Sequence, residues 1–203
     1  IDEDDIAGLL EKIKQASNSS LRQTVRHLKR IGIVPLRYDS WQLPYLLKIM
    51  GYSFGDGTIY FEGKRKRGTA CFYGKKEDLE KIRDDVRKIG FGASIYSRHR
   101  HHKIKTAYDT VSFETDEFCL KVSSRSFAIL LATLGTPVGN KCRQAYRVPA
   151  WVARAPLWQK RLFLSALFGA ELTRPRHKPG KRGNFCAPAF SMNKRTGIAE
   201  NGY

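Results

Sequence analysis

The chain has 203 residues, with 37 Lys and Arg against 19 Asp and Glu, and its formal net charge is +18. Such a cationic excess indicates a polyanionic partner, most simply nucleic acid. No stretch approaches the ~20 apolar residues of a membrane-spanning helix, and no secretory signal is visible, so we expect no membrane partner and a cytoplasmic, nucleoid-associated protein. The four cysteines form no Cys-x-x-Cys pair, which favours reduced thiols over a zinc site.

Residues 1–40 are predicted to form an N-terminal helical segment and a linker. An acidic cluster at 2–5 precedes an apolar helical stripe that runs to Ile13, and acids in a first turn stabilise a helix through its dipole. A second helix is predicted from residues 18–20 to Ile31, ended by Gly32. It carries four cations: Arg22, Arg26, Lys29 and Arg30. The pair could be part of a helix-turn-helix, and the favoured alternative is an appended helical subdomain.

The first motif is LPYLLKIMGYSFGDG, residues 43–57. Its apolar residues recur at helical spacing, and Pro44 suits an opening turn because the first N–H groups of a helix have no intrahelical partner. Gly51 and Gly55 lie four apart on one face, where a second backbone could approach closely. The motif therefore predicts a packed helix with Asp56 exposed at its end.

Two hairpins separated by a helix are predicted next. The strands Thr58–Glu62 and Gly68–Tyr73 flank a basic turn, an amphipathic helix follows at Lys75–Ile89, and the strands Phe91–Ser97 and Tyr108–Glu114 flank a basic connection at 98–107. We expect both connections to contact a nucleic-acid backbone. Their cations are Lys64, Arg65, Lys66, Arg67, Arg98, Arg100, Lys103 and Lys105.

A short strand at Phe118–Val122 and a helix at Ser124–Leu134, capped by Ser123 or Ser124, complete the first unit, residues 41–155. The predicted fold class is α+β, an αββαββα unit whose four-stranded antiparallel sheet forms a saddle that can follow a DNA major groove. Periodicity does not decide which alternate strand residues face DNA. The candidates are Thr58, Tyr60, Glu62, Ser94, Tyr96, Thr110 or Ser112.

A loop at 135–149 carries two further expected nucleic-acid contacts, Lys141 and Arg143, and we expect Trp151 to dock it onto the core. The second motif, PLWQKRLFLSALFGAEL at 156–172, repeats the first, with Ala166 and Ala170 as its small residues and Glu171 as its acid. Helices packed through the small residues would place Asp56 and Glu171 side by side. Paired carboxylates favour a divalent cation.

After Glu171 a basic tip and a strand at Phe185–Met192 are predicted, and the second unit, residues 156–203, is incomplete. The expected nucleic-acid contacts there are Arg174, Arg176, Lys178, Lys181 and Arg182. Because the chain begins at Ile1 without Met, we expect a fragment. The short second unit is explained by a truncated chain, a partly given one or a degenerate protein. We expect a monomer with internal pseudo-two-fold symmetry, with association as the alternative if the chain is truncated.

GYSFGDG, SALFGAEL and the connecting segment 118–152 resemble single-chain, archaeal and intein-type LAGLIDADG homing endonucleases. The resemblance implies a site-specific double-strand DNA endonuclease that uses Mg²⁺ or Mn²⁺, with Asp56 and Glu171 as the catalytic, metal-binding acids and water as nucleophile. Backbone oxygens of Gly55 and Ala170 would complete the metal site. The family also places a basic residue nearby, for which Lys121 is the candidate and a plain surface lysine the alternative.

Two departures from the family pattern leave cleavage open: Ala166 stands at the middle glycine of the signature and Leu172 at the terminal one. The alternative function is a non-cleaving nucleic-acid binder, such as an RNA maturase, a transcription regulator or an RNA- or ribosome-associated factor. A structural module is the third hypothesis. The ends lack splicing residues, which disfavours a complete intein and leaves an excised endonuclease domain open.

Overall fold

The structure is a computed structural model of the 203-residue chain that describes all residues except 13–17, 64–66, 106–108, 174–175, 178–184 and 191–203. The elements in chain order are α1 (Glu3–Lys12), α2 (Asn18–Arg30), α3 (Leu43–Phe54), β1 (Gly57–Glu62), β2 (Arg67–Gly74), α4 (Lys76–Lys88), β3 (Ser94–Lys105), β4 (Thr110–Val122), α5 (Arg125–Thr133), the 3₁₀ helix η1 (Lys141–Arg143), α6 (Ala150–Arg154), α7 (Leu157–Glu171), β5 (Arg176–His177) and β6 (Phe185–Cys186). The α+β class and the αββαββα order, from α3 to α5, are confirmed.

The four-stranded antiparallel sheet has the order β1-β2-β4-β3. Ile59, Ala70 and Val122 lie opposite one another across three strands, and all three are buried against the helices. Because successive side chains of a strand alternate between faces, the register decides which candidate residues share the outer face. Thr110 and Ser112 are an even number of residues from the buried Leu120, so they share the face that the helices cover. The opposite face carries the other candidates: Thr58, Tyr60, Glu62, Ser94 and Tyr96.

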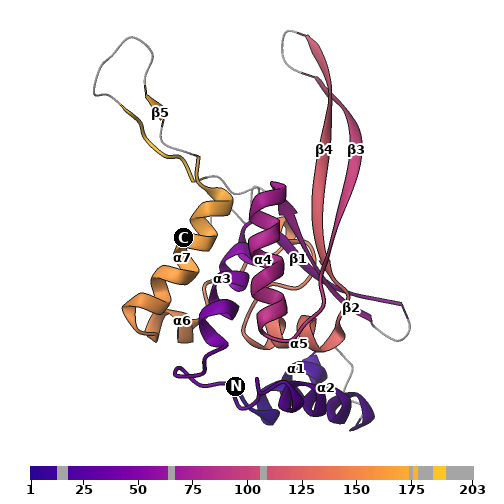
Figure 1. Ribbon diagram of the computed structural model, residues 1–203, viewed down its shortest axis with the longest axis vertical. Helices are drawn as coiled ribbons and strands as arrows, with labels where there is room; N and C mark the ends of the chain where they lie inside the picture. The colour runs from indigo at the N-terminus through magenta and orange to yellow at the C-terminus, as the bar shows by residue number, and fades with distance from the viewer. Residues whose placement is uncertain (13–17, 64–66, 106–108, 174–175, 178–184, 191–203) are drawn as a thin grey trace.

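Strands β3 and β4 form a long ribbon that projects from the body of the molecule (Figure 1). The prediction that 98–107 is a connection was wrong, because β3 continues to Lys105 and β4 begins at Thr110 and includes 118–122. Cross-strand pairs of charged side chains hold the ribbon, with His99 Nδ1 2.9 Å from Asp116 and Arg100 Nε 3.0 Å from Glu117. Val111 and Phe113 lie on one face of the ribbon, but most of its other side chains are polar or charged on both faces, so little apolar alternation marks its full length in the sequence.

Helix α3 lies at the centre of the molecule, packed between the sheet and α4 on one side and α7 on the other. Leu46, Leu47, Ile49 and Met50 are fully buried there. Its apolar residues are not confined to one stripe, which suits a helix with neighbours on both sides.

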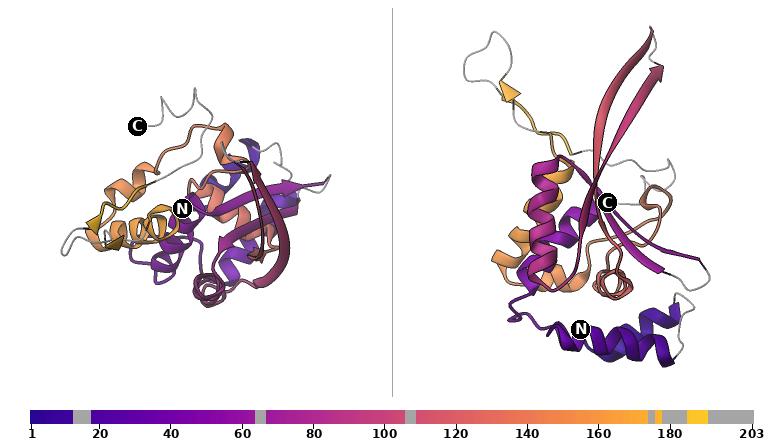
Figure 2. Two further views of the ribbon diagram at one scale, coloured as in Figure 1. Left: turned by 90° about the horizontal axis from the view of Figure 1, so that it is seen from above. Right: turned by 45° about the vertical axis from the view of Figure 1, so that its right-hand side comes forward.

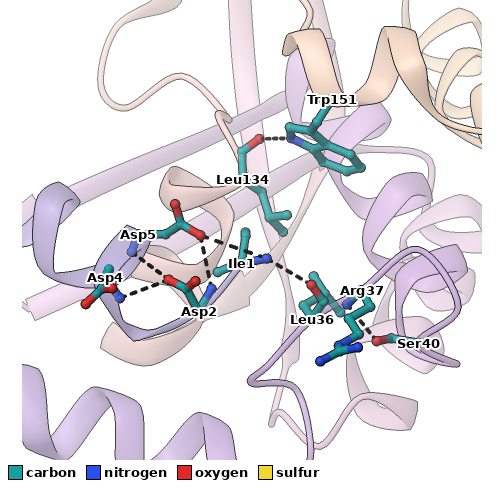
Figure 3. A network of polar contacts seen from close by, with 9 residues as sticks. All are labelled: Ile1, Asp2, Asp4, Asp5, Leu36, Arg37, Ser40, Leu134 and Trp151. Carbon is teal, nitrogen blue, oxygen red and sulfur yellow. Dashed lines mark hydrogen bonds and ion pairs between the residues drawn. The ribbon is translucent and has the colours of Figure 1, made fainter.

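Helices α1 and α2 pack against α5, at the end opposite to the projecting β3–β4 ribbon (Figures 1 and 2). The acidic cluster caps α1 as predicted, because Asp2 Oδ1 accepts hydrogen bonds from the backbone N–H groups of Asp4 (3.0 Å) and Asp5 (3.2 Å) (Figure 3). Ser124 caps α5, accepting from the Phe127 N–H at 3.3 Å.

The loop after α5 returns to the core along β1, where the Gly139 N–H donates to the Ile59 carbonyl at 2.6 Å. Trp151 docks as predicted: its Nε1 donates to the Leu134 carbonyl at 2.8 Å (Figure 3). Trp151 lies on α6, a five-residue helix that the sequence analysis did not predict. The strand predicted at Phe185–Met192 is shorter in the structure, because β6 ends at Cys186. Phe190 forms an isolated β-bridge to Leu172, and residues 191–192 lie outside the described part of the chain.

Candidate metal and nucleic-acid site

Small residues let the two motif helices cross at close range. A Cβ added to Gly51 would overlap the Phe163 carbonyl oxygen and lie 3.0 Å from the Ala166 Cβ. A Cβ added to Gly55 would lie 2.6 Å from the Ala170 Cβ. The crossing therefore admits no side chain at either glycine, and the ends of α3 and α7 come together.

The crossing places the two acids at one end of the helix pair. Asp56 follows the C-terminal residues of α3, and Glu171 is the last residue of α7. The Glu171 carboxylate lies over Gly55, with Oε1 3.3 Å from the position of a Cβ there. Burial raises the pKa of Glu171, and the charge of Asp56 raises it further; burial also raises the pKa of Asp56. The pair is therefore a site of like charge at the negative ends of two helix dipoles.

Lys141 supplies a compensating positive charge at the end of α3. Its half-buried ammonium donates hydrogen bonds to the carbonyl oxygens of Ser53 (2.8 Å), Phe54 (2.9 Å) and Gly55, the unsatisfied C-terminal acceptors of α3. The same charge opposes the rise in the pKa of both acids. Lys141 was expected to contact nucleic acid directly, but the structure places it against the end of α3 and beside the acid pair.

Lys121, the predicted basic residue of the site, lies on the outer face of the sheet, in the strand next to β2; on that same face of β2 is Tyr73, whose N–H donates to the Asp56 carbonyl at 2.9 Å. Lys121 stands on β4 between Cys71 of β2 and Ser94 of β3, and its charge acts on Cys119. A lysine whose charge acts on both acids is Lys141, more than 80 residues from α3 in the chain. No local period marks it, since it lies in the single 3₁₀ turn η1 within the connecting segment; the position of that segment against α3 reveals it.

Tyr146 from the same loop completes the surroundings of the α3 end. Its hydroxyl donates to the Phe54 carbonyl at 3.3 Å, and its ring packs edge-on against the Phe54 ring at 5.5 Å. Burial, followed by the charge of Glu171, raises the pKa of Tyr146 to about 12. The tyrosine is therefore a neutral hydrogen-bond donor beside the acids.

The described cations of the predicted interface follow the strands. Strand β2 exposes Arg67, and β3 exposes Arg98, Arg100 and Lys103 and also includes Lys105. Outside the sheet, η1 exposes Arg143 and β5 exposes Arg176. The other predicted contacts lie outside the described residues: Lys64, Arg65, Lys66, Arg174, Lys178, Lys181 and Arg182. The β3–β4 ribbon and β5 project on the side where α7 ends (Figure 1). Basic strands therefore flank the end of the helix pair that carries the acids.

The described residues contain no group of three or more His, Cys, Asp or Glu side chains that could hold a metal ion. A metal at the helix ends would therefore depend on two carboxylates and backbone oxygens. The same part of the chain contains no helix with both the length and the apolar character needed to cross a bilayer.

No family model matches the chain. It is 40% identical over 149 residues to the tRNA-splicing ligase RtcB of Pyrococcus furiosus, a match that covers 73% of this chain and 15% of that protein. It is 31% identical over 172 residues to the DNA-directed RNA polymerase subunit Rpo1N of Methanocaldococcus jannaschii, a match that covers 82% of this chain and 13% of that protein. It is also 30% identical over 152 residues to the replication factor C small subunit of the same organism, which covers 74% of this chain and 8% of that protein. The chain thus spans a small part of each relative's length.

Among solved structures, the chain is similar to the homing endonuclease I-WcaI bound to its DNA recognition sequence. The TM-score is 0.41 and the sequence identity 12%, over 76% of this chain and 66% of that chain.

Proposed function

We propose that this chain is the endonuclease part of a mobile insertion, a member of the LAGLIDADG homing endonucleases that cuts double-stranded DNA at a specific site. The observation that carries the proposal is the pairing of Asp56 and Glu171 at the joined ends of two helices that cross through small residues. Basic strands flank that end. A duplex held by them would present its phosphates to the two acids.

The curated relatives support an inserted element. Three proteins with unrelated names share this segment, and in each it makes up 15% or less of the length. One segment cannot be the part that ligates RNA, transcribes and serves replication. A segment that moves between host genes explains its presence in all three, and a site-specific nuclease is the activity that such movement requires.

The residues at the helix ends fit a divalent metal. Mg²⁺ and Mn²⁺ prefer carboxylate, carbonyl and water oxygens, and the site offers Asp56, Glu171 and the backbone oxygens of Gly55 and Ala170. A bound cation would relieve the repulsion between the acids and would supply the activation of water and the neutralisation of charge that phosphodiester hydrolysis needs.

A second candidate for the basic residue of the site, besides Lys121, is Lys141. Its ammonium lies beside both acids and is positioned by three carbonyl oxygens, so it can offset negative charge that develops on a phosphate. Because it also donates to the Gly55 carbonyl, its positive charge opposes the binding of a metal to the same oxygen.

The two departures from the family pattern are compatible with this proposal. Ala166 fits at the crossing, where its Cβ would lie 3.0 Å from a Cβ at Gly51. The Leu172 N–H donates to the Phe168 carbonyl at 2.8 Å, so the helical bonding continues past Glu171 without a terminal glycine.

The proposal is tested with a duplex that joins the sequences flanking the matching segment in the gene of a relative. We expect Mg²⁺-dependent double-strand cleavage, and we expect Asp56→Asn and Glu171→Gln each to lower the rate by about 10³-fold or more. Asp84→Asn, at an exposed acid of α4, is the matched control and should cleave normally. Equal activity of all three variants would contradict the assignment.

A second candidate function is a nucleic-acid binder that does not cleave. It is favoured by the Lys141 ammonium, which occupies the end of α3 where a metal would need the Gly55 carbonyl. A binder of this kind holds duplex or RNA in the presence of EDTA and keeps its affinity when both acids are replaced by amides. The nuclease hypothesis alone requires metal-dependent cleavage that the amides abolish.

A further inference from the structure

A second cationic surface lies on α2, at the end of the molecule opposite to the β3–β4 ribbon (Figures 1 and 2). The 13 residues of α2 contain no Asp or Glu. Val25 and Leu28 are buried and fix the inner face of the helix. The outer face carries exposed cations: Arg22, Arg26, Lys29 and Arg30.

These four side chains form one stripe along the helix, because their spacing of four, seven and eight residues returns to the same face. The stripe is about 12 Å long at a rise of ~1.5 Å per residue. It borders an open groove of ≈ 790 Å³ whose remaining lining is Glu3, Leu21 and Val25. Among the described residues, Lys29 is the member of the stripe with an ion-pair partner, Glu3.

Helix α4 shows what a solvated charged face looks like in the same protein. Its cations alternate with acids, and two of them pair with an acid of the same helix: Lys81 with Asp78 at 3.3 Å and Arg83 with Asp84 at 3.6 Å. The stripe on α2 has no such alternation. Its charge is therefore left for an external anion rather than balanced within the helix.

We propose that α2 is a second nucleic-acid contact, which binds the phosphodiester backbone of a duplex separate from the segment held at the acid pair. A duplex carries one phosphate per ~3.4 Å of each strand, so a stripe of about 12 Å faces about three to four phosphates. Three of the four cations are arginines, whose guanidinium groups form paired hydrogen bonds with phosphate oxygens.

The composition of the surface distinguishes this partner from an acidic protein. Protein interfaces have aromatic and other apolar residues at their centre, whereas interfaces with nucleic acid are polar and strongly cationic. None of the large exposed apolar side chains of the described residues lies on α2. The inference rests on the nucleic-acid partner of the proposed function, but not on cleavage.

The test compares two variants that remove equal charge from exposed helices. R22Q/R26Q/K29Q/R30Q neutralises the α2 stripe, and K76Q/K81Q/R87Q/K88Q neutralises four exposed cations of α4. Each variant is titrated in EDTA with a duplex of about 14 base pairs that lacks any target, over a range of salt concentrations. We expect the wild type and the α4 variant to bind two duplexes per chain and the α2 variant to bind one.

The site lost from the α2 variant should have a slope of log K against log salt of about −3 to −4, from four phosphate contacts at ~0.9 each. If the fourfold variant is unfolded under the conditions of the titration, the double variant R22Q/R26Q tests the same site. Its slope of log K against log salt should be smaller in magnitude than that of the wild type by about 2. Two duplexes bound by the folded α2 variant, or one bound by the α4 control, would overturn the proposal. Displacement of the second duplex by polyglutamate at equal charge concentration would overturn it in favour of an acidic protein.

The result is independent of nuclease activity. Asp56→Asn removes a proposed catalytic acid and should still bind two duplexes. A chain that binds two duplexes but cuts none would remove the proposed function and leave the α2 contact standing.

Discussion

The two motif helices carry equivalent sequences in different surroundings. When Asp56 is matched with Glu171, Ile49 of α3 corresponds to Leu164 of α7, and Ser53 corresponds to Phe168. Ile49 and Ser53 are 0% and 1% exposed, whereas Leu164 and Phe168 are 39% and 41% exposed. Helix α3 is enclosed by the sheet, α4 and α7, whereas α7 has α3 as its main described neighbour. The core therefore positions Asp56, and the crossing with α3 positions Glu171.

The largest expected difference between the helices is in the free energy of unfolding. Ile49→Ala should lower it by about 2–5 kcal/mol, because a fully buried side chain leaves a cavity. Leu164→Ala, at the matched position of α7, should lower it by less than about 1 kcal/mol, since this side chain is already partly in water. Urea denaturation of both variants measures the contrast, and equal losses would show that α7 is covered as completely as α3.

The crossing itself can be broken with a single methyl group. Gly51→Ala should lower the free energy of unfolding by about 1–3 kcal/mol, because the added Cβ overlaps the Phe163 carbonyl. Gly169→Ala is the matched control on α7, where a Cβ would have no neighbour within 4 Å.

The control should be neutral or stabilising by up to about 1 kcal/mol, because alanine favours a helix more than glycine does. The two identical substitutions are therefore predicted to differ in sign. Chemical denaturation measures both, and a stabilising Gly51→Ala would mean that the helices are not in close contact at this point.

The third prediction concerns the cation beside the acids. Lys141→Met removes a positive charge that competes with a metal for the Gly55 carbonyl, so the affinity for Mn²⁺ should rise about tenfold, or ~1.4 kcal/mol. Titration calorimetry measures this, with Arg143→Met on the same 3₁₀ helix as the control. Unchanged or weaker metal binding by Lys141→Met would show that the lysine only caps α3.

The smallest expected effect is a pH dependence. The pKa of Glu171 is raised in the folded protein, so the unfolded chain releases this proton first as the pH rises, and stability falls between the ordinary carboxyl pKa and the raised one. In metal-free buffer, Glu171→Gln should therefore be more stable than the wild type at neutral pH. The difference should close below about pH 4, where the carboxyl group is protonated in both states. Thermal melts across this range measure the effect; a variant less stable at neutral pH would contradict the repulsion between the acids.

The motif helices, the hairpins and the αββαββα order were predictable because periodicity, proline and glycine mark them locally. The small residues of both motifs likewise predicted a close crossing. The β3–β4 ribbon was predicted too short because its charged side chains face water on both sides, so burial leaves little pattern. Lys141 was assigned to nucleic acid because its partners at 53–55 are distant in sequence and are backbone carbonyls, which no sequence pattern reveals. The choice of strand face likewise needed the observed register.

The central claim is that Asp56 and Glu171 share a divalent cation. The most direct measurement is anomalous scattering from crystals of the chain soaked in Mn²⁺. The account predicts a peak between the two carboxylates, with the Lys141 ammonium moved away from the Gly55 carbonyl. Empty density there, with Mn²⁺ bound only at other acids such as those of the β3–β4 ribbon, would contradict it.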